Sequence, residues 1–362
     1  MCKLTLRSRC VTLNMNYLFI QLNNIDIPEE RFDILSIGEG IDVEMYLESP
    51  AHLLTYKGEE MTDVVEQSSI REDLGKYDFM ALIRKPMIAV WMDTEQREWE
   101  FENKEEADSY YAVKTLSCTN LVQIFALGLW MVKDCSVYSD LSYWCNTDTT
   151  YSSKNRRSIQ QLNAFGKAKM TFFNSEEISD AFGYMTSIMQ IFAEARNNNA
   201  PIDSVYSQGT HVLNIEAALS NNGCSFYRIL ILLQLARKTG LLCEKISWYC
   251  AILESLFAIE RNHKKNVSEM TAAFITDTEQ EKMEVIHSMR MAYKIRSEFV
   301  HGSVSSLVGS NAQAELGKLS SEVDSYVRRA LRKAFFDENI NYEETTEDKK
   351  RVREYLRNNW PC

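Results

Sequence analysis

Proline and glycine are scarce in this chain of 362 residues, which contains 5 and 13 of them. Collagen-like and long low-complexity sequences need far more of both, so these classes are excluded. Because proline interrupts helices, its rarity also favours a largely helical chain. Hydrophobic residues make up 45% of the sequence, enough for packed cores, and the length favours two domains.

Cysteine pairs with the spacing of metal or redox motifs are also missing. None of the nine cysteines is spaced as Cys-x2-Cys, the pattern of zinc sites and thioredoxin-like motifs. Their odd number and irregular positions indicate reduced thiols in an intracellular protein. The sequence also lacks a Walker loop and a Gly-x-Gly-x-x-Gly run. We therefore expect no metal and no cofactor.

Long hydrophobic runs are absent as well. Residues 11–22 are interrupted by Asn14, Asn16 and Gln21, so they do not form the core of a signal peptide. The most apolar run, residues 121–132, contains Gln123 and is too short to span a bilayer. The sequence therefore predicts a cytoplasmic protein that does not enter a membrane.

Charge is distributed unevenly along the chain, whose formal net charge is −11. Residues 1–211 contain 19 Lys and Arg against 31 Asp and Glu (−12), whereas residues 212–362 contain 21 against 20 (+1). An acidic protein does not bind nucleic acid through bulk charge, so an RNA substrate would need a local basic pocket in the carboxyl-terminal half. The acidic half is either a solvated surface or a region that recruits a basic partner.

The amino-terminal part of the chain combines strand-like and helical patterns. Alternation of apolar and polar residues, or a short buried run, predicts strands at residues 2–13, 16–22, 41–47 and 87–91. Helical spacing follows over residues 104–133 and 176–196, the second helix being capped by Asn174 or Ser175. We expect an α+β domain over residues 1–200, with a polar linker at 197–209.

Beyond Thr210 the pattern is helical only. The expected helices are residues 224–238, 241–260, 267–275, a helix capped at Asp277 or Thr278 that runs to His301, and 316–336. Gly302 suits the left-handed position that ends many helices. We expect an all-α domain over residues 211–336 and a charged helix or tail over 337–362, so that the whole chain is mainly α.

The most informative stretch is residues 293–302, Tyr-Lys-Ile-Arg-Ser-Glu-Phe-Val-His-Gly. With the residues before it, its apolar side chains form one helical stripe that includes Phe299 and Val300. Arg296 falls within this stripe. Since a guanidinium keeps its charge, it needs a carboxylate, a phosphate or an interface there. His301 is expected at the helix end, where the dipole favours an imidazolium.

Spacing alone leaves two interpretations of this stretch open. In the first, Arg296 is a structural residue paired with an acid, for which Glu254 is the candidate, and His301 is a capping residue. In the second, Arg296 and His301 together bind and cleave a phosphodiester. The second requires a distorted helix end or the meeting of two chains, because five residues on an ideal helix are separated by about 140° of rotation.

Two groups of basic residues are further candidates for RNA contacts. The first follows a polar stretch that contains Tyr143 and Trp144, and it consists of Lys154, Arg156 and Arg157. Aromatic and basic residues together either clamp single-stranded RNA or form an ordered surface loop. The second group lies near the end of the last core helix and consists of Arg328, Arg329, Arg332 and Lys333. These residues either complement the helix dipole or contact phosphates.

The run Tyr-Lys-Ile followed by Arg-x4-His-Gly resembles the Arg-x4–6-His signature of HEPN domains and is most similar to the Apea-like HEPN family. Two upstream stretches also resemble this family: residues 244–257, which end in Leu-Glu-Ser-Leu-Phe, and the segment that begins with His263-Lys264. The family often has an arginine where this chain has Met270. The resemblance covers roughly residues 212–335.

This resemblance implies an α+β domain followed by an all-α HEPN helical bundle with metal-independent endoribonuclease activity. His301 would act as general acid or base, and Arg296 would neutralise charge on the phosphate. The supporting residues would be Ser297, Glu254 and Tyr293. HEPN ribonucleases usually pair their motifs across a homodimer, and no cofactor is implied.

The family also suggests a biological setting, namely prokaryotic antiphage defence by abortive infection, or a toxin that cuts cellular RNA. The amino-terminal domain would then be a sensor or a restraint that binds a phage or regulatory protein. Two alternatives stay open. One is a non-catalytic HEPN interaction module in which Arg296 bridges subunits, and the other is a regulator that binds RNA without cleaving it.

Overall fold

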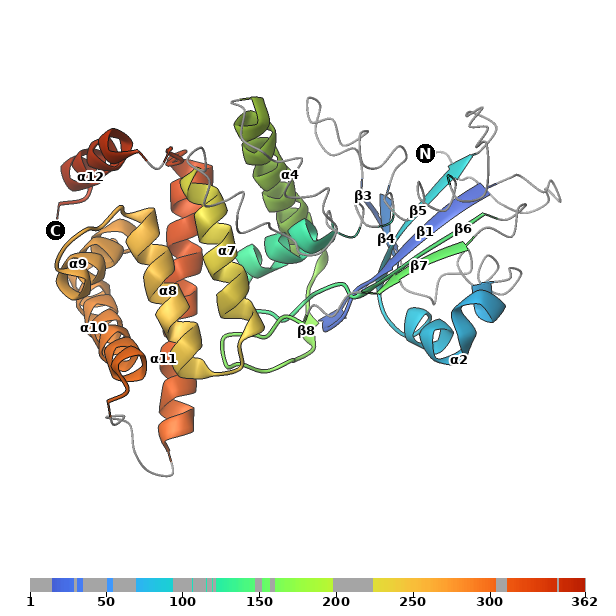
Figure 1. Cartoon of the computed structure of the whole chain (residues 1–362), viewed down its shortest axis with the longest axis horizontal. Helices are drawn as coiled ribbons and strands as arrows, with labels where there is room; N and C mark the ends of the chain where they lie inside the picture. Colours follow the sequence, from blue (N-terminus) through green and yellow to red (C-terminus); the bar gives the residue numbers. More distant parts are fainter. Residues whose placement is uncertain are drawn as a thin grey trace. The chain divides into compact units, whose positions relative to one another are not determined.

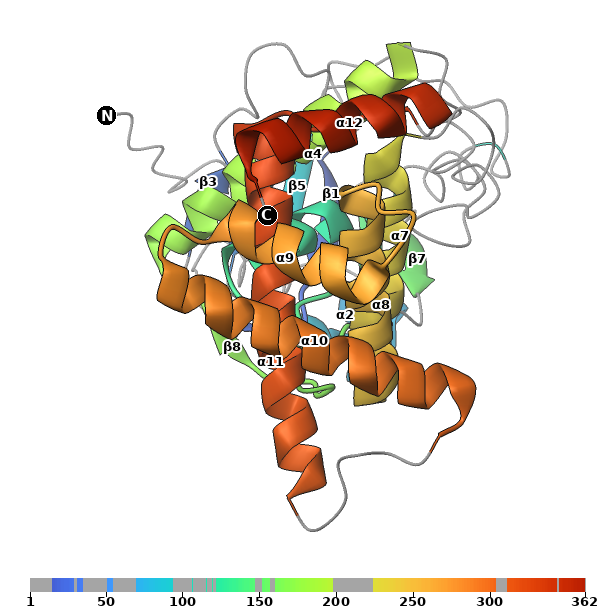
Figure 2. The same ribbon diagram turned by 90° about the vertical axis from the view of Figure 1, so that its left-hand side faces the viewer.

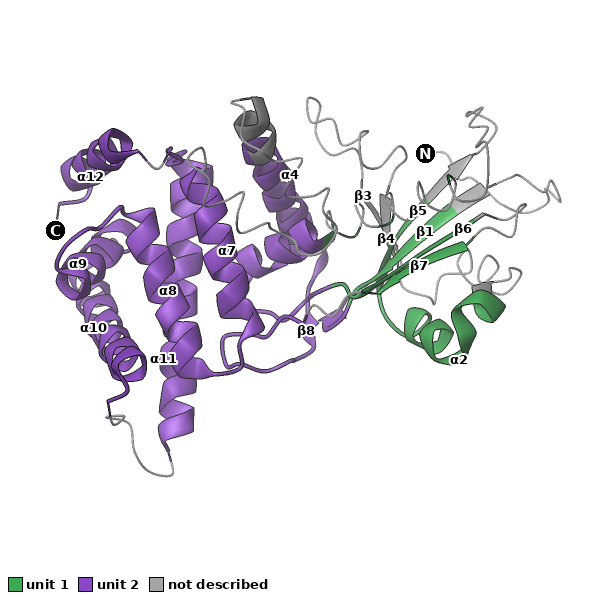
Figure 3. Ribbon diagram, in the orientation of Figure 1, with its two compact units in different colours: residues 1–22, 27–122, 139–158 green, residues 23–26, 123–138, 159–362 purple. Residues whose placement is uncertain are grey.

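The computed structural model describes residues 15–28, 31–34, 51–54, 70–93, 106, 115, 119, 122–146, 152–156, 160–197, 224–303, 311–343 and 345–361. Within these ranges the chain is mainly helical, with an antiparallel sheet in the amino-terminal region, as the sequence predicts. Contacts divide the chain into two compact units, coloured separately in Figure 3: unit 1 (residues 1–22, 27–122 and 139–158) and unit 2 (residues 23–26, 123–138 and 159–362). In the described part, the structure contains no helix that is both long and apolar enough to cross a membrane.

Unit 1 is built on an antiparallel sheet with the strand order β3-β4-β5-β1-β6-β7 (Figure 1). The strands are β1 (Met15–Gln21), β3 (Arg31–Ile34), β4 (Ala51–Leu54), β5 (Met87–Asp93), β6 (Leu141–Asn146) and β7 (Ser152–Arg156). In the register of the sheet, Leu18 of β1 lies between Val90 and Trp144. β1 and β5 correspond to the strands predicted at 16–22 and 87–91. The strands predicted at 2–13 and 41–47 lie outside the described residues.

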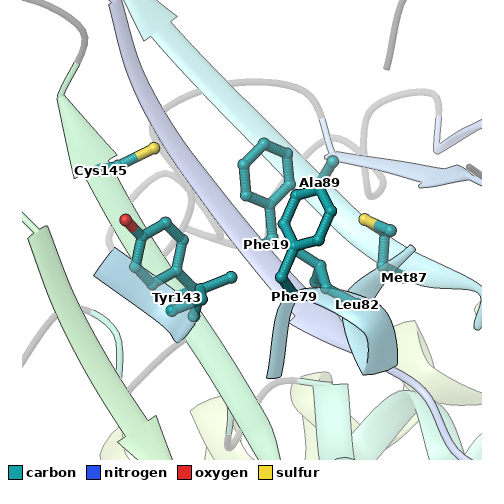
Figure 4. Packing of buried hydrophobic residues seen from close by; sticks show 8 residues of the cluster. Phe19, Phe79, Leu82, Met87, Ala89, Tyr143 and Cys145 are labelled. Carbon is teal, nitrogen blue, oxygen red and sulfur yellow. The ribbon is translucent and has the colours of Figure 1, made fainter. Parts of the chain in front are cut away.

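One face of this sheet packs against helix α2 (Ile70–Leu82). Figure 4 shows Phe79 and Leu82 of this helix against Phe19 on β1 and Met87 on β5. Successive side chains of a strand point to opposite faces, so alternate residues reach this core, such as Met87 and Ala89 on β5 and Tyr143 and Cys145 on β6. Tyr143 belongs to the same cluster, and its hydroxyl donates to a carboxylate oxygen of Asp73 on α2 at 3.0 Å.

The prediction of a surface loop near residues 139–157 is wrong. Residues 141–145 pair with 152–156 as the antiparallel strands β6 and β7, and β6 also pairs with β1. Tyr143 and Trp144 are both buried. The reason is that adjacent residues of a strand face opposite sides of the sheet, and both sides are covered at this position. These aromatic rings therefore serve the core.

Unit 2 is helical. In addition to the helical residues 123–132, its helices are α4 (Ser175–Asn197), α7 (Ser225–Lys238), α8 (Leu242–Leu256), α9 (His263–Ile275), α10 (Glu279–His301), α11 (Ala312–Arg332) and α12 (Thr346–Asn359). A π-helical turn, η3 (Lys333–Asp337), follows α11, and β2 (Ile25–Asp26) pairs in parallel with β8 (Thr171–Phe172). Helix α8 contacts α7, α9, α10 and α11, and Figure 2 shows α9 and α10 side by side.

The boundaries of several helices follow local sequence signals. Thr278 caps α10 by accepting from the backbone N–H of Glu281 at 3.3 Å, and Gly302 ends the helix with φ of 68°. At the start of α4, Asn174 and Glu177 exchange side chain to backbone hydrogen bonds of 2.9 and 3.0 Å, which is a capping box. Helix α9 begins at His263, earlier than the predicted start at residue 267.

Unit 2 also contains a buried polar network centred on Asp324 of α11. The carboxylate of this residue accepts from the indole N–H of Trp130 at 3.1 Å and from the hydroxyl of Tyr249 at 2.7 Å, and it pairs with Arg328. It thereby joins the helix over 123–132, α8 and α11. Nearby, burial and the charge of Asp324 raise the pKa of Asp134 to about 6.

The two units divide the chain at other places than the predicted domains. Residues 123–138 and 159–197, expected in a domain over 1–200, belong to unit 2, and so do residues 337–362. Tertiary contacts explain this difference. For example, Ser320 donates to the carbonyl oxygen of Ala164 at 2.6 Å across 156 positions of sequence. Local patterns carry no trace of such contacts. Residues 198–209 of the predicted linker lie outside the described residues.

Candidate functional site

Arg296 on α10 forms an ion pair with Glu254 on α8. Its guanidinium donates to both carboxylate oxygens, with a distance of 3.3 Å between Nη2 and Oε2. The side chains are 31% exposed for Arg296 and 16% exposed for Glu254. A half-buried guanidinium with a bidentate carboxylate partner is held in a fixed orientation. This ion pair is the one expected if Arg296 is a structural residue paired with an acid.

Tyr293 completes the surroundings of this ion pair. Its hydroxyl donates to Oε1 of Glu254 at 2.9 Å, and its ring centroid lies 5.6 Å from Cζ of Arg296. Burial is the main cause that raises the pKa of the Tyr293 hydroxyl, and Cys250 and Glu254 act in the same direction. The hydroxyl therefore stays protonated and serves as a hydrogen-bond donor.

His263, the first residue of α9, lies on the other side of the same carboxylate. Its Nδ1 atom is buried and 3.5 Å from Oε1 of Glu254, whereas the side chain as a whole is 42% exposed. In the sequence, His263 belongs to a stretch of family resemblance and is not one of the predicted site residues. The signal that points to it is the run of three basic residues that it forms with Lys264 and Lys265. Glu254 thus lies between an arginine and an imidazole of the same chain.

His301 is the last residue of α10 and is exposed. The helix is continuous from Glu279 to His301, and its end is closed by a 2.9 Å hydrogen bond from the backbone N–H of Ser303 to the carbonyl of Glu298. The end is therefore not distorted, and about 140° of rotation separates His301 from Arg296. A single chain does not bring these two residues to one face of the helix.

The apolar stripe of α10 is shorter than predicted. Its buried residues are Val285, Met289, Ala292, Tyr293 and Ile295. The prediction that Phe299 and Val300 continue this stripe is wrong, because these side chains are 43% and 61% exposed. The last turn of the helix is open to solvent. His301 consequently stands beside two exposed apolar side chains.

A pocket of about 710 Å³ lies next to this cluster and is lined by Asn262, His263, Lys264, Lys265 and Arg290. Four of these five residues are basic. Arg290 pairs with Glu269 at 3.4 Å. An RNA substrate would need a basic pocket in the carboxyl-terminal half. The pocket found there is lined by residues that were not predicted as RNA contacts.

The first predicted group of RNA contacts is engaged within unit 1. Lys154 and Arg156 both pair with Asp78 on α2, and the Lys154 pair has a length of 2.8 Å. Since Tyr143 and Trp144 are buried, they are not available to stack on bases. Arg157 lies outside the described residues. The structure therefore does not form the predicted aromatic and basic clamp in its described part.

The second group is also used mainly inside the protein. Arg328 is buried against Asp324, and Arg329 donates to Glu281 at 2.7 Å and to the carbonyl of Ile275. Arg332 is half-buried. The idea that Arg328 contacts phosphate is wrong, because its guanidinium balances a buried carboxylate. Ser297, the remaining predicted site residue, is exposed.

No family model, no curated protein and no solved structure matches this chain. Among the described residues, no group of three or more His, Cys, Asp or Glu side chains is placed to hold a metal ion. The described cysteines are free, namely Cys135, Cys145, Cys224, Cys243 and Cys250. Function is therefore inferred from the sequence motif and from the geometry around Glu254.

Proposed function

We propose that this protein is a metal-independent HEPN endoribonuclease that acts on RNA in the cytoplasm as a homodimer. The sequence support is the resemblance of residues 293–302 and of the two upstream stretches to the Apea-like HEPN family. One structural observation carries the proposal. Helix α10 fixes Arg296 against Glu254 and ends in an exposed His301 beside exposed apolar side chains.

The proposed reaction needs only the RNA, two side chains and solvent water. The 2′-hydroxyl of a ribose attacks the adjacent phosphorus, a new P–O bond forms and the bond to the 5′-oxygen breaks, which leaves a 2′,3′-cyclic phosphate. The imidazole of His301 either accepts the proton of the 2′-hydroxyl or donates a proton to the departing 5′-oxygen, and a solvent water exchanges the other proton. Arg296 donates to the non-bridging oxygens and neutralises their developing charge.

The geometry of α10 supports the proposal of a homodimer. Because His301 and Arg296 of one chain face different directions, a second copy is needed to bring its His301 to the first Arg296. A two-fold arrangement pairs identical surfaces and builds two equivalent sites. Phe299 and Val300, exposed in one chain, would be covered in this interface.

The proposed setting is antiphage defence by abortive infection, or a toxin that cuts cellular RNA. Unit 1 and the acidic charge of the amino-terminal half would then serve to sense a phage or regulatory protein. Such a partner would carry a basic surface, since residues 1–211 have a charge balance of −12.

A non-catalytic HEPN module is the second candidate, and a specific observation favours it. Glu254 already neutralises Arg296, which lowers the positive charge available to a phosphate. The ion pair would then have a structural role, and the basic pocket would make the protein an RNA-binding regulator.

Expression of the wild type and of His301→Ala, with sequencing of RNA ends, tests the proposal. We expect new ends with cyclic phosphates only in the wild type, unchanged by EDTA. His287→Ala is the matched control, because His287 is also an exposed histidine of α10. Cleavage that persists in His301→Ala excludes the assigned role. The non-catalytic candidate predicts no RNA cleavage by any of these proteins.

A further inference from the structure

The basic pocket beside Glu254 brings together side chains from two helices. Lys264 and Lys265 come from the first turn of α9, and Arg290 comes from α10. Its volume of about 710 Å³ lies within the range of small-ligand sites, roughly 300–1,000 Å³. The pocket is an open depression, and four of its five lining residues are basic. An open basic depression suits one anionic group of a larger ligand.

Acidic residues balance only some of the basic residues that line the pocket. Glu269 pairs with Arg290, and Glu254 faces His263. For Lys264 and Lys265, the described residues provide no ion pair. With two lysines left over, an anion entering the pocket meets a positive local field, although the whole chain has a net charge of −11.

The start of α9 departs from the usual placement of charge. Acidic residues stabilise the first turn of a helix, yet this turn contains none, and the side chain of Asn262 makes no capping hydrogen bond. Helix α7 also has no acidic residue in its first turn and no side-chain cap, whereas α10 and α12 have both. The start of α9 differs from that of α7 in its three basic residues, which cost stability locally.

His263 connects the pocket to Arg296. It lines the pocket, and its Nδ1 atom points to the carboxylate that also holds Arg296. The imidazole therefore lies in contact with both the carboxylate of Glu254 and the pocket. An imidazole has at least one N–H group that can donate to an anion.

We propose that this pocket binds a backbone phosphate of single-stranded RNA and that His263, which lies beside Glu254, donates to that phosphate. This inference deepens the proposed function, on which it rests, by assigning a phosphate-binding subsite next to Arg296. His263 here binds the phosphate and takes no part in the proton transfers assigned to His301. The neighbouring phosphate of the strand would lie toward Arg296.

The test measures the affinity of the full chain for a labelled single-stranded RNA with 2′-O-methyl riboses, which cannot undergo attack by the 2′-hydroxyl. The pocket variant is Lys264→Glu/Lys265→Glu. The control is Lys318→Glu/Lys350→Glu, which changes the charge equally at two exposed lysines outside the pocket. We expect at least about a tenfold higher Kd for the pocket variant and a salt slope lower by about 2, but less than about a threefold change for the control.

His263→Ala refines the test, because alanine removes the imidazole donor while the two lysines stay. We expect roughly a threefold to tenfold loss of affinity, since one hydrogen bond to the phosphate is lost. Equal losses of RNA affinity in the pocket variant and the control would show that RNA binds through the overall charge of the protein, and would overturn the inference. Binding of inorganic phosphate but not of RNA would overturn it as well.

Failure of this inference is distinguishable from failure of the proposed function. If the wild type cleaves ordinary RNA and the pocket variant binds and cleaves as well as the wild type, the nuclease stands and the subsite is excluded. If RNA binds through the pocket but no protein cleaves it, the subsite stands and the nuclease is excluded. His301→Ala should lose cleavage while keeping its RNA affinity within about twofold, because His301 lies outside the pocket.

Discussion

The guanidinium of Arg296 donates to the carboxylate of Glu254, a residue 42 positions earlier in the chain. The same carboxylate accepts from Tyr293 and faces Nδ1 of His263. One side chain of α8 therefore contacts side chains of both α9 and α10. Any ligand that approaches Arg296 or His263 alters the balance of charge around Glu254.

Glu254→Ala and Arg296→Ala, alone and combined, form a double-mutant cycle for this ion pair. We expect a coupling energy of about 1–2 kcal/mol, because the pair is bidentate but partly exposed to water, which screens it. Urea unfolding of the four proteins provides the measurement. The pair of Glu269 and Arg290, which is longer and more exposed, is the control and should couple by less than about 0.5 kcal/mol. Equal coupling in the two cycles would contradict the special role of Glu254.

Val300→Asp tests whether the end of α10 forms the interface between two chains. A carboxylate in an apolar interface must be desolvated, so we expect at least about a tenfold weaker dimer and a parallel loss of cleavage. Light scattering coupled to size-exclusion chromatography measures the mass. Met283→Asp, at another exposed apolar residue of α10, should leave the dimer intact. A dimer that withstands Val300→Asp would place the interface elsewhere.

Gly128 and Gly183 provide a matched pair of substitutions by alanine. A Cβ atom at Gly128 would lie 2.2 Å from the carbonyl oxygen of Ala181 on α4, so Gly128→Ala should destabilise the protein by roughly 2–3 kcal/mol. Nothing lies within 4 Å of a Cβ atom at Gly183, so Gly183→Ala should stabilise α4 by up to about 1 kcal/mol. Thermal unfolding measures both changes. A stable Gly128→Ala protein would show that the two helices separate without cost.

Asp134→Asn should change how stability depends on pH. Burial first, and then the charge of Asp324, raise the pKa of Asp134 to about 6, against the lowering effects of the Ala164 N–H, Arg328 and Arg237. The folded protein therefore holds a proton that the unfolded chain has already released, and its stability falls as the pH rises from about 4 to 6.

An asparagine side chain stays neutral over this pH range, and its oxygen can still accept from the N–H of Ala164. The stability of Asp134→Asn relative to the wild type should thus rise by roughly 1–3 kcal/mol between about pH 4 and pH 7. Urea unfolding across this range gives the measurement. Asp180→Asn, at an exposed residue of α4, should show no such trend. A flat difference for Asp134→Asn would mean that this carboxyl group titrates normally.

Local signals explain which parts of the fold are predictable. Thr278 and Gly302 mark the ends of α10 because a cap needs only neighbouring backbone groups. The division into two units is not predictable in this way. It depends on contacts such as that between Trp130 and Asp324, which are 194 positions apart.

The candidate site was predictable where the sequence places a charged side chain among apolar ones, because such a charge needs a partner. Arg296 in an apolar surrounding requires an acid, and that requirement points to Glu254. The place of His263 depends on how α8 and α9 pack, which periodicity does not specify. The role of Arg328 was not predictable. The sequence places it in a basic cluster near a helix end, but it is buried and balances the carboxylate of Asp324.

The sequence separation between Trp130 and Asp324 also determines how late in synthesis their contact can form. All segments of unit 1 have been synthesised by residue 158, whereas the carboxylate that satisfies Trp130 appears 194 residues after it. At about 5–20 residues per second, the helix over 123–132 waits for about 10–40 s before its acceptor emerges. A nascent chain therefore exposes this helix to chaperones for much of its synthesis, and the cluster around Glu254 assembles only after Arg296 has emerged.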